Sequence, residues 1–197
     1  MTSTTAFEPP VLASAALVLD FVNTRSDGSG RVERLADGEA LVTWAQDAEL
    51  AAPGLAATAA DSASARELRE ALVTVLLAHS DPDGDGRTEL DAAEHFLRRA
   101  ASRHPLVAVV TADELTLVSE QPGVPGVLGT VLAAVAELAS SDVWSRLKAC
   151  QNPPCHFGFV DRTRNGSGKY CSTGCGSQVS MRTMRSRRRA ESVRPSG

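Results

Sequence analysis

The chain has 197 residues, a formal net charge of −4 at pH 7 and 43% hydrophobic residues. This length suits one main domain with a single core and a small additional module. The apolar run at residues 127–139 is too short to cross a membrane and contains Glu137, so no membrane partner is expected. Residues 1–7 carry no cationic side chain, unlike the start of a cleavable signal peptide, and we therefore expect a cytoplasmic location.

Apolar residues at helical spacing dominate residues 1–145, and only 4% of the chain is aromatic, which favours closely packed helices. Residues 106–111 and 115–119 instead have the composition of two strands joined in a short hairpin. The sequence therefore predicts a mainly α fold with a small β-hairpin. The expected helices span residues 12–23, 37–50 with Asp37 as N-cap, 64–79, 88–102, 125–140 and 142–149, and a last helix begins within residues 172–176 and ends near 190.

We expect a helical N-terminal domain over residues 1–145, with its hairpin near 106–119, and a small C-terminal module over residues 146–190. The tail at residues 191–197 contains Pro195 and Gly197 and is expected to be disordered.

Three polar residues interrupt the first apolar helix near its end: Asp20, Asn23 and Thr24. They are candidates for a small-molecule pocket that would make the N-terminal domain a sensor. In the structural interpretation, which we favour, Asn23 and Thr24 satisfy backbone groups where the helix stops, and Asp20 pairs with an arginine such as Arg66 or Arg69.

Four cysteines form two close pairs, C-x4-C and C-x3-C, separated by fifteen residues: Cys150, Cys155, Cys171 and Cys175. Structural zinc modules use such pairs to surround one tetrahedral ion. The segment between the pairs has few apolar residues, so it needs a metal or disulfides to fold. Two disulfides are the alternative, but no export signal accompanies them. We expect one structural Zn²⁺ on the four cysteines, with His156 outside the ligand set.

Charge is distributed unevenly along the chain. From Arg146 onward the chain has eleven basic residues and only two acidic ones, Asp161 and Glu191, which gives this part a formal charge of +9. Because the whole chain has −4, residues 1–145 carry −13. This asymmetry predicts a nucleic-acid-binding end attached to a domain that phosphate does not attract, although a solvated basic tail without a ligand remains open.

In the last helix, Arg182, Arg185 and Arg189 are spaced by three and four residues and line one side. A guanidinium face suits a DNA groove, where arginine contacts phosphates or guanine edges. Met181 and Met184 point elsewhere and are expected to pack on Phe157 or Phe159. The candidate DNA contacts among the basic residues are Arg162, Arg164, Lys169, Arg182, Arg185, Arg187, Arg188 and Arg189.

The segment around the cysteines resembles the CGNR zinc finger. Its matching positions are Asn152, Pro153, Phe159, Asp161, Thr163, Arg164, Asn165, Tyr170, Ser172 and Gly176. Residues 17–24, Leu-Val-Leu-Asp-Phe-Val-Asn-Thr, are similar to the signature of the helical ABATE domain that accompanies this finger and is associated with stress-induced transcription regulation. The two resemblances span nearly the whole chain and imply a zinc-dependent transcription regulator.

The chain departs from the CGNR pattern in three places. Ser177-Gln178 stand where the family has Asn-Arg, the last cysteine pair is one residue closer than usual, and Gly168-Lys169 replace basic residues before the aromatic-Cys pair. Gln178 therefore joins the candidate DNA contacts as a position where the family's arginine is lost. All four thiols remain, so zinc binding is expected to survive.

These patterns predict a transcription regulator that binds double-stranded DNA through its finger, with a small-molecule effector and a second copy of the chain as further candidate partners. The alternative is a non-DNA adaptor or a metabolite or redox sensor whose finger contacts protein. RNA binding is disfavoured because few stacking aromatics lie near the basic segment. The histidines, His79, His95, His104 and His156, have no evident nucleophile partner, so we expect no enzyme activity.

Overall fold

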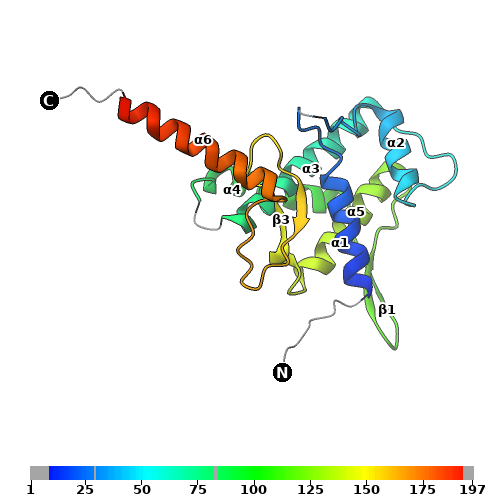
Figure 1. Ribbon diagram of the computed structural model, residues 1–197. Coiled ribbons are helices and arrows are strands. Elements are labelled where there is room, and N and C mark those ends of the chain that lie inside the picture. Colours follow the sequence, from blue (N-terminus) through cyan, green and yellow to red (C-terminus); the bar gives the residue numbers. More distant parts are fainter. Residues whose placement is uncertain (1–8, 29, 82–83, 193–197) are drawn as a thin grey trace.

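The computed structural model describes residues 9–28, 30–81 and 84–192. The described chain is mainly helical, as predicted, and it contains two two-stranded antiparallel sheets. Figure 1 shows the last helix extending away from a body formed by the other elements. In chain order the elements are α1 (Pro9–Val22), α2 (Gly38–Asp47), α3 (Ala59–Ser80), α4 (Arg87–Arg103), β1 (Val107–Val110), β2 (Leu115–Val118), α5 (Gly123–Ala139), the 3-10 turn η1 (Trp144–Arg146), β3 (Leu147–Ala149), β4 (Gly158–Val160) and α6 (Thr173–Ser192).

Side-chain caps fix where two of the helices begin. Asp37 caps α2 as predicted, accepting a hydrogen bond from Ala40 N at 2.9 Å. Helix α3 begins at Ala59, earlier than the predicted residue 64, because Thr58 and Asp61 form a capping box. In this box the Thr58 N–H donates to Asp61 Oδ2 at 2.7 Å, and Asp61 N–H donates to Thr58 Oγ1 at 3.2 Å.

The core lies where α1, α3 and α5 pack against one another. Phe21 of α1, Leu72 of α3 and Val131 of α5 are fully buried. Trp44 of α2 closes one side of this core, with its ring centroid 5.1 Å from that of Phe21. Each such side chain contributes about 1.5–3 kcal/mol through removal of apolar surface from water, so these helices form one hydrophobic unit.

The β1–β2 hairpin is confirmed, with Val107 opposite Val118 and Val110 opposite Leu115. Its apolar side chains are largely on the surface: Val110 is 71% exposed and Leu115 is 63% exposed.

The helix predicted over residues 142–149 is wrong. A single 3-10 turn, η1, is followed by the strand β3, which pairs with β4 through Leu147 opposite Val160 and Ala149 opposite Gly158. Leu147 and Ala149 join the hydrophobic core, while Lys148 between them binds Asp161. This alternation has a period of two residues, which only a strand provides.

Both outer edges of the β3–β4 sheet are covered by side chains of the helical domain. On the β3 edge, His79 Nδ1 lies 2.8 Å from Leu147 O, and Ser80 Oγ donates to Ala149 O at 2.9 Å. On the β4 edge, the Asn23 side chain pairs with both backbone groups of Gly158: Asn23 Nδ2 donates to Gly158 O at 3.1 Å, and Gly158 N donates to Asn23 Oδ1 at 2.7 Å. The helices therefore satisfy the backbone groups that an open sheet edge leaves unpaired.

Gly158 permits the close approach of α1 to this sheet. A Cβ atom at this position would lie 2.6 Å from Val22 Cγ2 and 3.1 Å from Leu19 Cδ2. The sheet that carries the first cysteine pair is thus built into the helical core.

Two further expectations differ from the structure. Met181 and Met184 are 49% and 57% exposed, so they are not buried against the finger as packing on Phe157 or Phe159 would imply. The predicted tail at residues 191–197 overlaps the end of α6, which reaches Ser192, and residues 193–197 lie outside the described residues.

Replacing Asn23 by alanine is expected to lower the free energy of unfolding by about 1–3 kcal/mol, because the buried backbone groups of Gly158 lose their partner. Urea denaturation followed by circular dichroism measures this change. The matched control is Gln46→Ala, which removes an exposed amide on α2 and is expected to change the stability by less than about 0.5 kcal/mol. Equal stability of the Asn23→Ala variant and the wild-type protein would contradict the proposed role of these two bonds.

Candidate metal centre and basic helix

The four cysteines come from separate elements that meet at one point. Cys150 directly follows β3, Cys155 lies in the loop to β4, Cys171 precedes α6, and Cys175 lies in its first turn. The four sulfur atoms all lie within 4.8 Å of one another. Cys150 is buried, whereas the other three are partly exposed.

The distances between the sulfur atoms fit a tetrahedral zinc ion. Cys155 Sγ lies 3.7 Å from Cys171 Sγ, which lies 3.7 Å from Cys175 Sγ. A tetrahedron with Zn–S bonds of about 2.3 Å has edges of about 3.75 Å, whereas a disulfide bond measures about 2.05 Å. None of the four cysteines is in a disulfide in this structure, which favours a zinc site over the alternative of two disulfides. The cysteines form a single zinc site, as predicted.

The backbone around the first cysteine pair is folded by its own hydrogen bonds. Cys155 N donates to Asn152 O at 2.7 Å, and Cys150 N donates to Phe157 O at 2.9 Å. His156 has a left-handed backbone, with φ of 43°, and its Nδ1 lies 3.1 Å from Cys150 O. This ring nitrogen therefore contacts the backbone of Cys150, one of the four metal-binding cysteines. Burial, followed by the charge of Arg25, lowers the pKa of His156 and favours its neutral form.

The thiols differ in how readily they ionise. A hydrogen bond from Asn152 lowers the pKa of Cys175 to about 7, whereas burial and the neighbouring sulfurs raise the pKa of Cys171. Thiolates this close repel one another, and a divalent cation removes that cost by binding all four. Arg31 adds positive charge beside them, with Nη2 3.9 Å from Cys155 Sγ.

A buried ion pair holds the loop between β4 and α6. Lys148 Nζ lies 2.9 Å from Asp161 Oδ2, and the two side chains are only 4% and 1% exposed. Asp161 also accepts hydrogen bonds from Thr163 N at 2.9 Å and Gly168 N at 2.8 Å. Burial raises the pKa of Asp161, but the bonds from Lys148 and Thr163 outweigh it and hold this pKa well below the usual range. The carboxylate thus fixes both ends of the loop that carries Arg162 and Arg164.

Replacing Asp161 by asparagine is expected to destabilise the protein at pH 7 by about 3–5 kcal/mol, because Lys148 stays buried without its counter-charge. The difference from wild type should shrink as pH falls below about 4, since a carboxyl with a depressed folded-state pKa contributes stability only where it is ionised. Urea denaturation of the wild-type and variant proteins, at pH 7 and again below about pH 4, measures this difference in stability. The double variant Lys148→Met/Asp161→Asn should recover part of the loss, and a double variant less stable than the single one would contradict the ion-pair explanation.

Asp20 binds two partners on neighbouring elements. Its Oδ2 accepts a hydrogen bond from Trp44 Nε1 at 2.6 Å, and its Oδ1 lies 3.1 Å from Arg34 Nη1. Its arginine partner is therefore Arg34, whereas the sequence had suggested Arg66 or Arg69.

Thr24 satisfies a backbone group near the end of α1, as the structural interpretation expected, whereas Asn23 pairs with the backbone of Gly158 in β4 and not with the end of its own helix. Thr24 Oγ1 donates to Phe21 O at 2.7 Å and accepts from Arg69 Nη1 at 3.1 Å. Arg69 is itself paired with Glu33 at 2.6 Å. These contacts favour a structural role for the three polar residues over a ligand pocket.

The basic residues expected to contact DNA lie on the β4–α6 loop and on α6. On the loop, Arg162 and Arg164 are exposed, whereas Lys169 forms an ion pair with Asp81 at 3.1 Å. At the start of α6, Gln178 Oε1 accepts a hydrogen bond from Asn152 Nδ2 at 2.9 Å. Position 178 therefore contacts the first cysteine loop.

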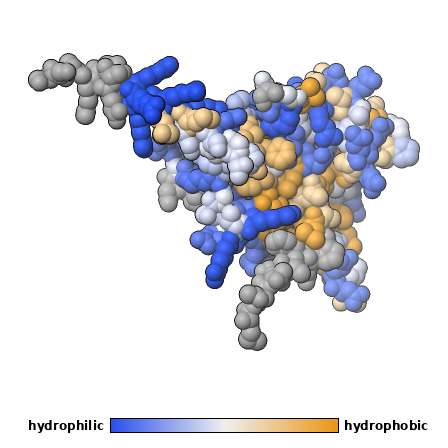
Figure 2. Space-filling view, viewed as in Figure 1, coloured by the Kyte–Doolittle hydropathy of each residue, from blue (hydrophilic) through white to orange (hydrophobic). Residues whose placement is uncertain are grey.

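Further along α6, Arg182 Nη1 donates to Pro153 O at 3.0 Å. Arg185, Arg187, Arg188 and Arg189 are all exposed. Figure 2 shows hydrophilic residues on the outer part of the projecting helix and paler or apolar ones nearer the body, where apolar colour gathers. Within the described residues, no helix is long and apolar enough to cross a membrane.

Sequence reasoning missed the arginines of the N-terminal domain that hold the first cysteine loop. Arg25 Nη1 donates to Pro154 O at 3.3 Å, and Arg31 Nη2 donates to Cys155 O. The Arg31 guanidinium also lies over the Phe157 ring, 5.0 Å from its centroid. The available signal was the cluster of arginines directly after the motif at residues 17–24, but nothing in the sequence identifies their distant partners.

Comparison with family models agrees with both parts of this architecture. The model described as "Putative stress-induced transcription regulator", ABATE, matches residues 15–142. The CGNR zinc finger model matches residues 146–188. The chain belongs to the ABATE family and carries a CGNR zinc finger. No curated protein matches the chain.

The purified protein is expected to contain about one zinc ion per chain with Zn–S distances near 2.3 Å. Elemental analysis and X-ray absorption spectroscopy test this expectation. Cys171→Ser should lose most of the metal, whereas Thr173→Ala, at an exposed position two residues further along, should keep it. A metal-free protein, or a disulfide between Cys150 and Cys155, would contradict the site.

Proposed function

We propose that this protein is a DNA-binding transcription regulator, in which the zinc finger and α6 contact the duplex and the N-terminal domain has a sensing or regulatory role. The families that match the chain support a regulatory role. The observation that carries DNA binding is the arginine face of α6, on a helix anchored by a zinc ligand and projecting from the body.

This face begins at the metal centre. Gln178, Arg182, Arg185 and Arg189 follow Cys175 at spacings of three, four, three and four residues. In a helix such spacing places all five on one side. The hydrogen bond of Arg182 to Pro153 keeps the first arginine of this series beside the cysteine loop. The metal centre therefore orients the basic face of α6.

Helix α6 has the size and accessibility that a DNA groove requires. It contains 20 residues, which correspond to about 30 Å of helix. The major groove of B-DNA is about 12 Å wide and accommodates an α-helix. Residues 181–189 are all exposed, so no rearrangement of the body is needed to reach DNA.

Electrostatics favour the same end of the molecule. The formal charge of +9 from Arg146 onward becomes about +7 when a zinc ion and four thiolates replace the thiols. Residues 1–145 carry −13, so phosphate is attracted to the finger and repelled by the remaining domain. This asymmetry would orient the protein on the duplex with α6 toward the DNA.

Binding to a labelled DNA duplex at several salt concentrations tests the proposal. If about five phosphates are neutralised, the log–log slope of affinity against salt should be roughly −4. Arg185→Ala/Arg189→Ala should weaken binding to all duplexes without changing zinc content or helicity. The matched control, Arg98→Ala/Arg99→Ala on α4, removes the same charge outside the finger and should bind as wild type. Binding insensitive to salt, or equal losses in both double variants, would remove this function for α6.

The alternative is an adaptor or a metabolite or redox sensor whose finger contacts another protein. The exposed Met181 and Met184 favour it, since flexible apolar side chains adapt to protein partners. In that case, duplex binding is weak in the wild-type protein and in both double variants. A homodimer, a cytoplasmic location and the absence of enzyme activity stay predictions from the sequence.

A further inference from the structure

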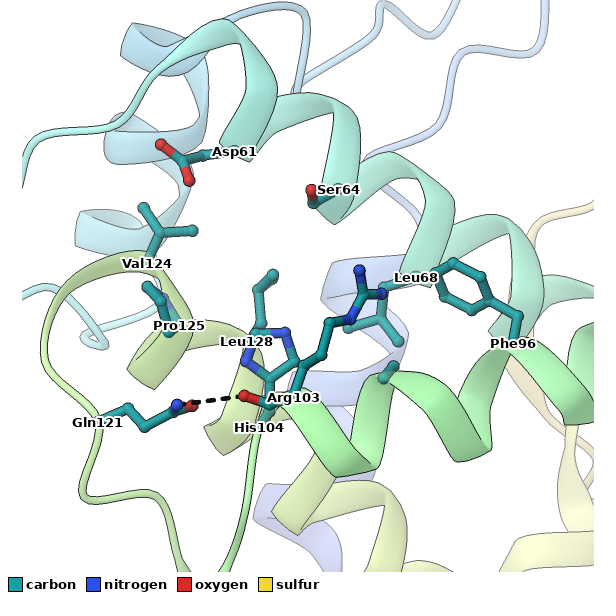
Figure 3. Close-up of a pocket in the computed structure, with 11 residues that line it drawn as sticks. Asp61, Ser64, Leu68, Phe96, Arg103, His104, Gln121, Val124, Pro125 and Leu128 are labelled. Carbon is teal, nitrogen blue, oxygen red and sulfur yellow. Dashed lines mark hydrogen bonds between the residues drawn. The ribbon is translucent and has the colours of Figure 1, made fainter.

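A small cavity lies between the N-terminal half of α3, the end of α4 and the start of α5, on residues to which no function is assigned. Its volume is about 270 Å³. Figure 3 shows side chains from these elements arranged around an open space. The apolar part of the lining consists of Leu68, Phe96, Ala100, Val124, Pro125 and Leu128. A cavity of this size and apolar character suits one small molecule.

Two residues of the lining carry buried polar atoms without partners. His104 Nδ1 and Gln121 Oε1 are buried, and neither has a hydrogen-bond partner among the described residues. The amide of Gln121 is oriented by the bond from its Nε2 to Arg103 O, 3.1 Å long, which leaves Oε1 as a free acceptor. Buried polar atoms are usually paired, and those at a cavity are candidates for bonds to a ligand.

The lining also carries two opposite charges. Arg103 belongs to α4, and its guanidinium lies 5.9 Å from the centroid of the Phe96 ring. Within the described residues, Arg103 has no ion-pair partner. Asp61 belongs to α3, where its Oδ2 serves the capping box. Figure 3 shows Asp61 and Arg103 on different sides of the opening, with Ser64 between them on the α3 side. A ligand there meets a cation at one side and a carboxylate at another.

We propose that this cavity binds a small zwitterion with an apolar body, namely an apolar α-amino acid. The carboxylate of the ligand faces Arg103, its ammonium group faces Asp61, and its side chain covers Leu68 and Leu128. Such a ligand also serves either tautomer of His104, since the carboxylate accepts a bond from a protonated Nδ1 and the ammonium donates to an unprotonated one. A purely anionic ligand would meet the Asp61 carboxylate, and a purely cationic one would meet Arg103.

The position of the cavity links it to the regulatory half of the proposed function, on which its biological meaning rests. Asp61, Ser64 and Leu68 lie in the N-terminal half of α3, and the C-terminal end of the same helix holds β3 through His79 and Ser80. Amino acid binding and attachment of the finger therefore share one helix. Binding of an amino acid to the cavity requires neither DNA nor contact between the finger and DNA. The proposal of an amino acid site and the proposal of DNA binding can therefore fail separately.

Isothermal titration calorimetry of the full zinc-loaded chain with L-phenylalanine and L-leucine tests the proposal. At least one of them is expected to bind with a dissociation constant below about 1 mM. Two matched probes, phenethylamine and 3-phenylpropionate, each lack one charge of phenylalanine and are expected to bind at least roughly tenfold more weakly, as loss of a charge-assisted bond implies. Absence of binding by both amino acids, or equal binding of either probe lacking one charge, would overturn the proposal.

Paired variants locate the site. Arg103→Met should weaken binding of the amino acid by roughly tenfold, whereas Arg99→Met should leave the affinity unchanged. Arg99 is the right control because its guanidinium also lies 5.9 Å from the Phe96 ring centroid but lines a different hollow. Ser64→Trp, at an exposed position of the lining, should block the cavity and keep the wild-type circular dichroism. Equal affinity in the two arginine variants, or full affinity in a folded Ser64→Trp variant, would place any binding elsewhere.

Discussion

The structure depends on how the two edges of the β3–β4 sheet are covered. A sheet of two three-residue strands is too small to be stable alone. Here Asn23 from α1 occupies one edge, while His79 and Ser80 from α3 occupy the other. The helical core therefore helps to position the first cysteine pair. The zinc site joins this pair to the second pair, which comes from the loop and α6.

This arrangement explains why the ABATE motif and the finger occur in one structural unit. Residues 17–24 look like an ordinary amphipathic helix, yet Leu19, Val22 and Asn23 surround Gly158 of the finger. The ion pair of Lys148 with Asp161 extends the same unit into the loop before α6. Leu147 and Ala149 belong to the common hydrophobic core. Substitutions that disrupt the first half of the finger should therefore also destabilise the helical domain.

The sequence was most informative where a signal is local. The cysteine spacing identified the metal ligands, and Asp37 marked the start of α2, because both depend on residues a few positions apart. The helix predicted over residues 142–149 failed because three strand residues give too short a pattern to oppose a helical one. The sequence could not predict the partners of Asp20 and Asn23, or the roles of Arg25 and Arg31, for a different reason. Their contacts join residues far apart in sequence, and many polar side chains are chemically able to make them.

The exposure of residues 181–189 has an evolutionary consequence. Packing imposes little on side chains that touch mainly solvent, so substitutions there are expected to cost little stability. The cysteines, Asp161 and Gly158 have no such freedom, because each is fixed by several neighbours. The molecule thus separates a segment that tolerates change from a framework that does not. Related chains could acquire new partners by altering the outer part of α6 while the rest of the protein stays the same.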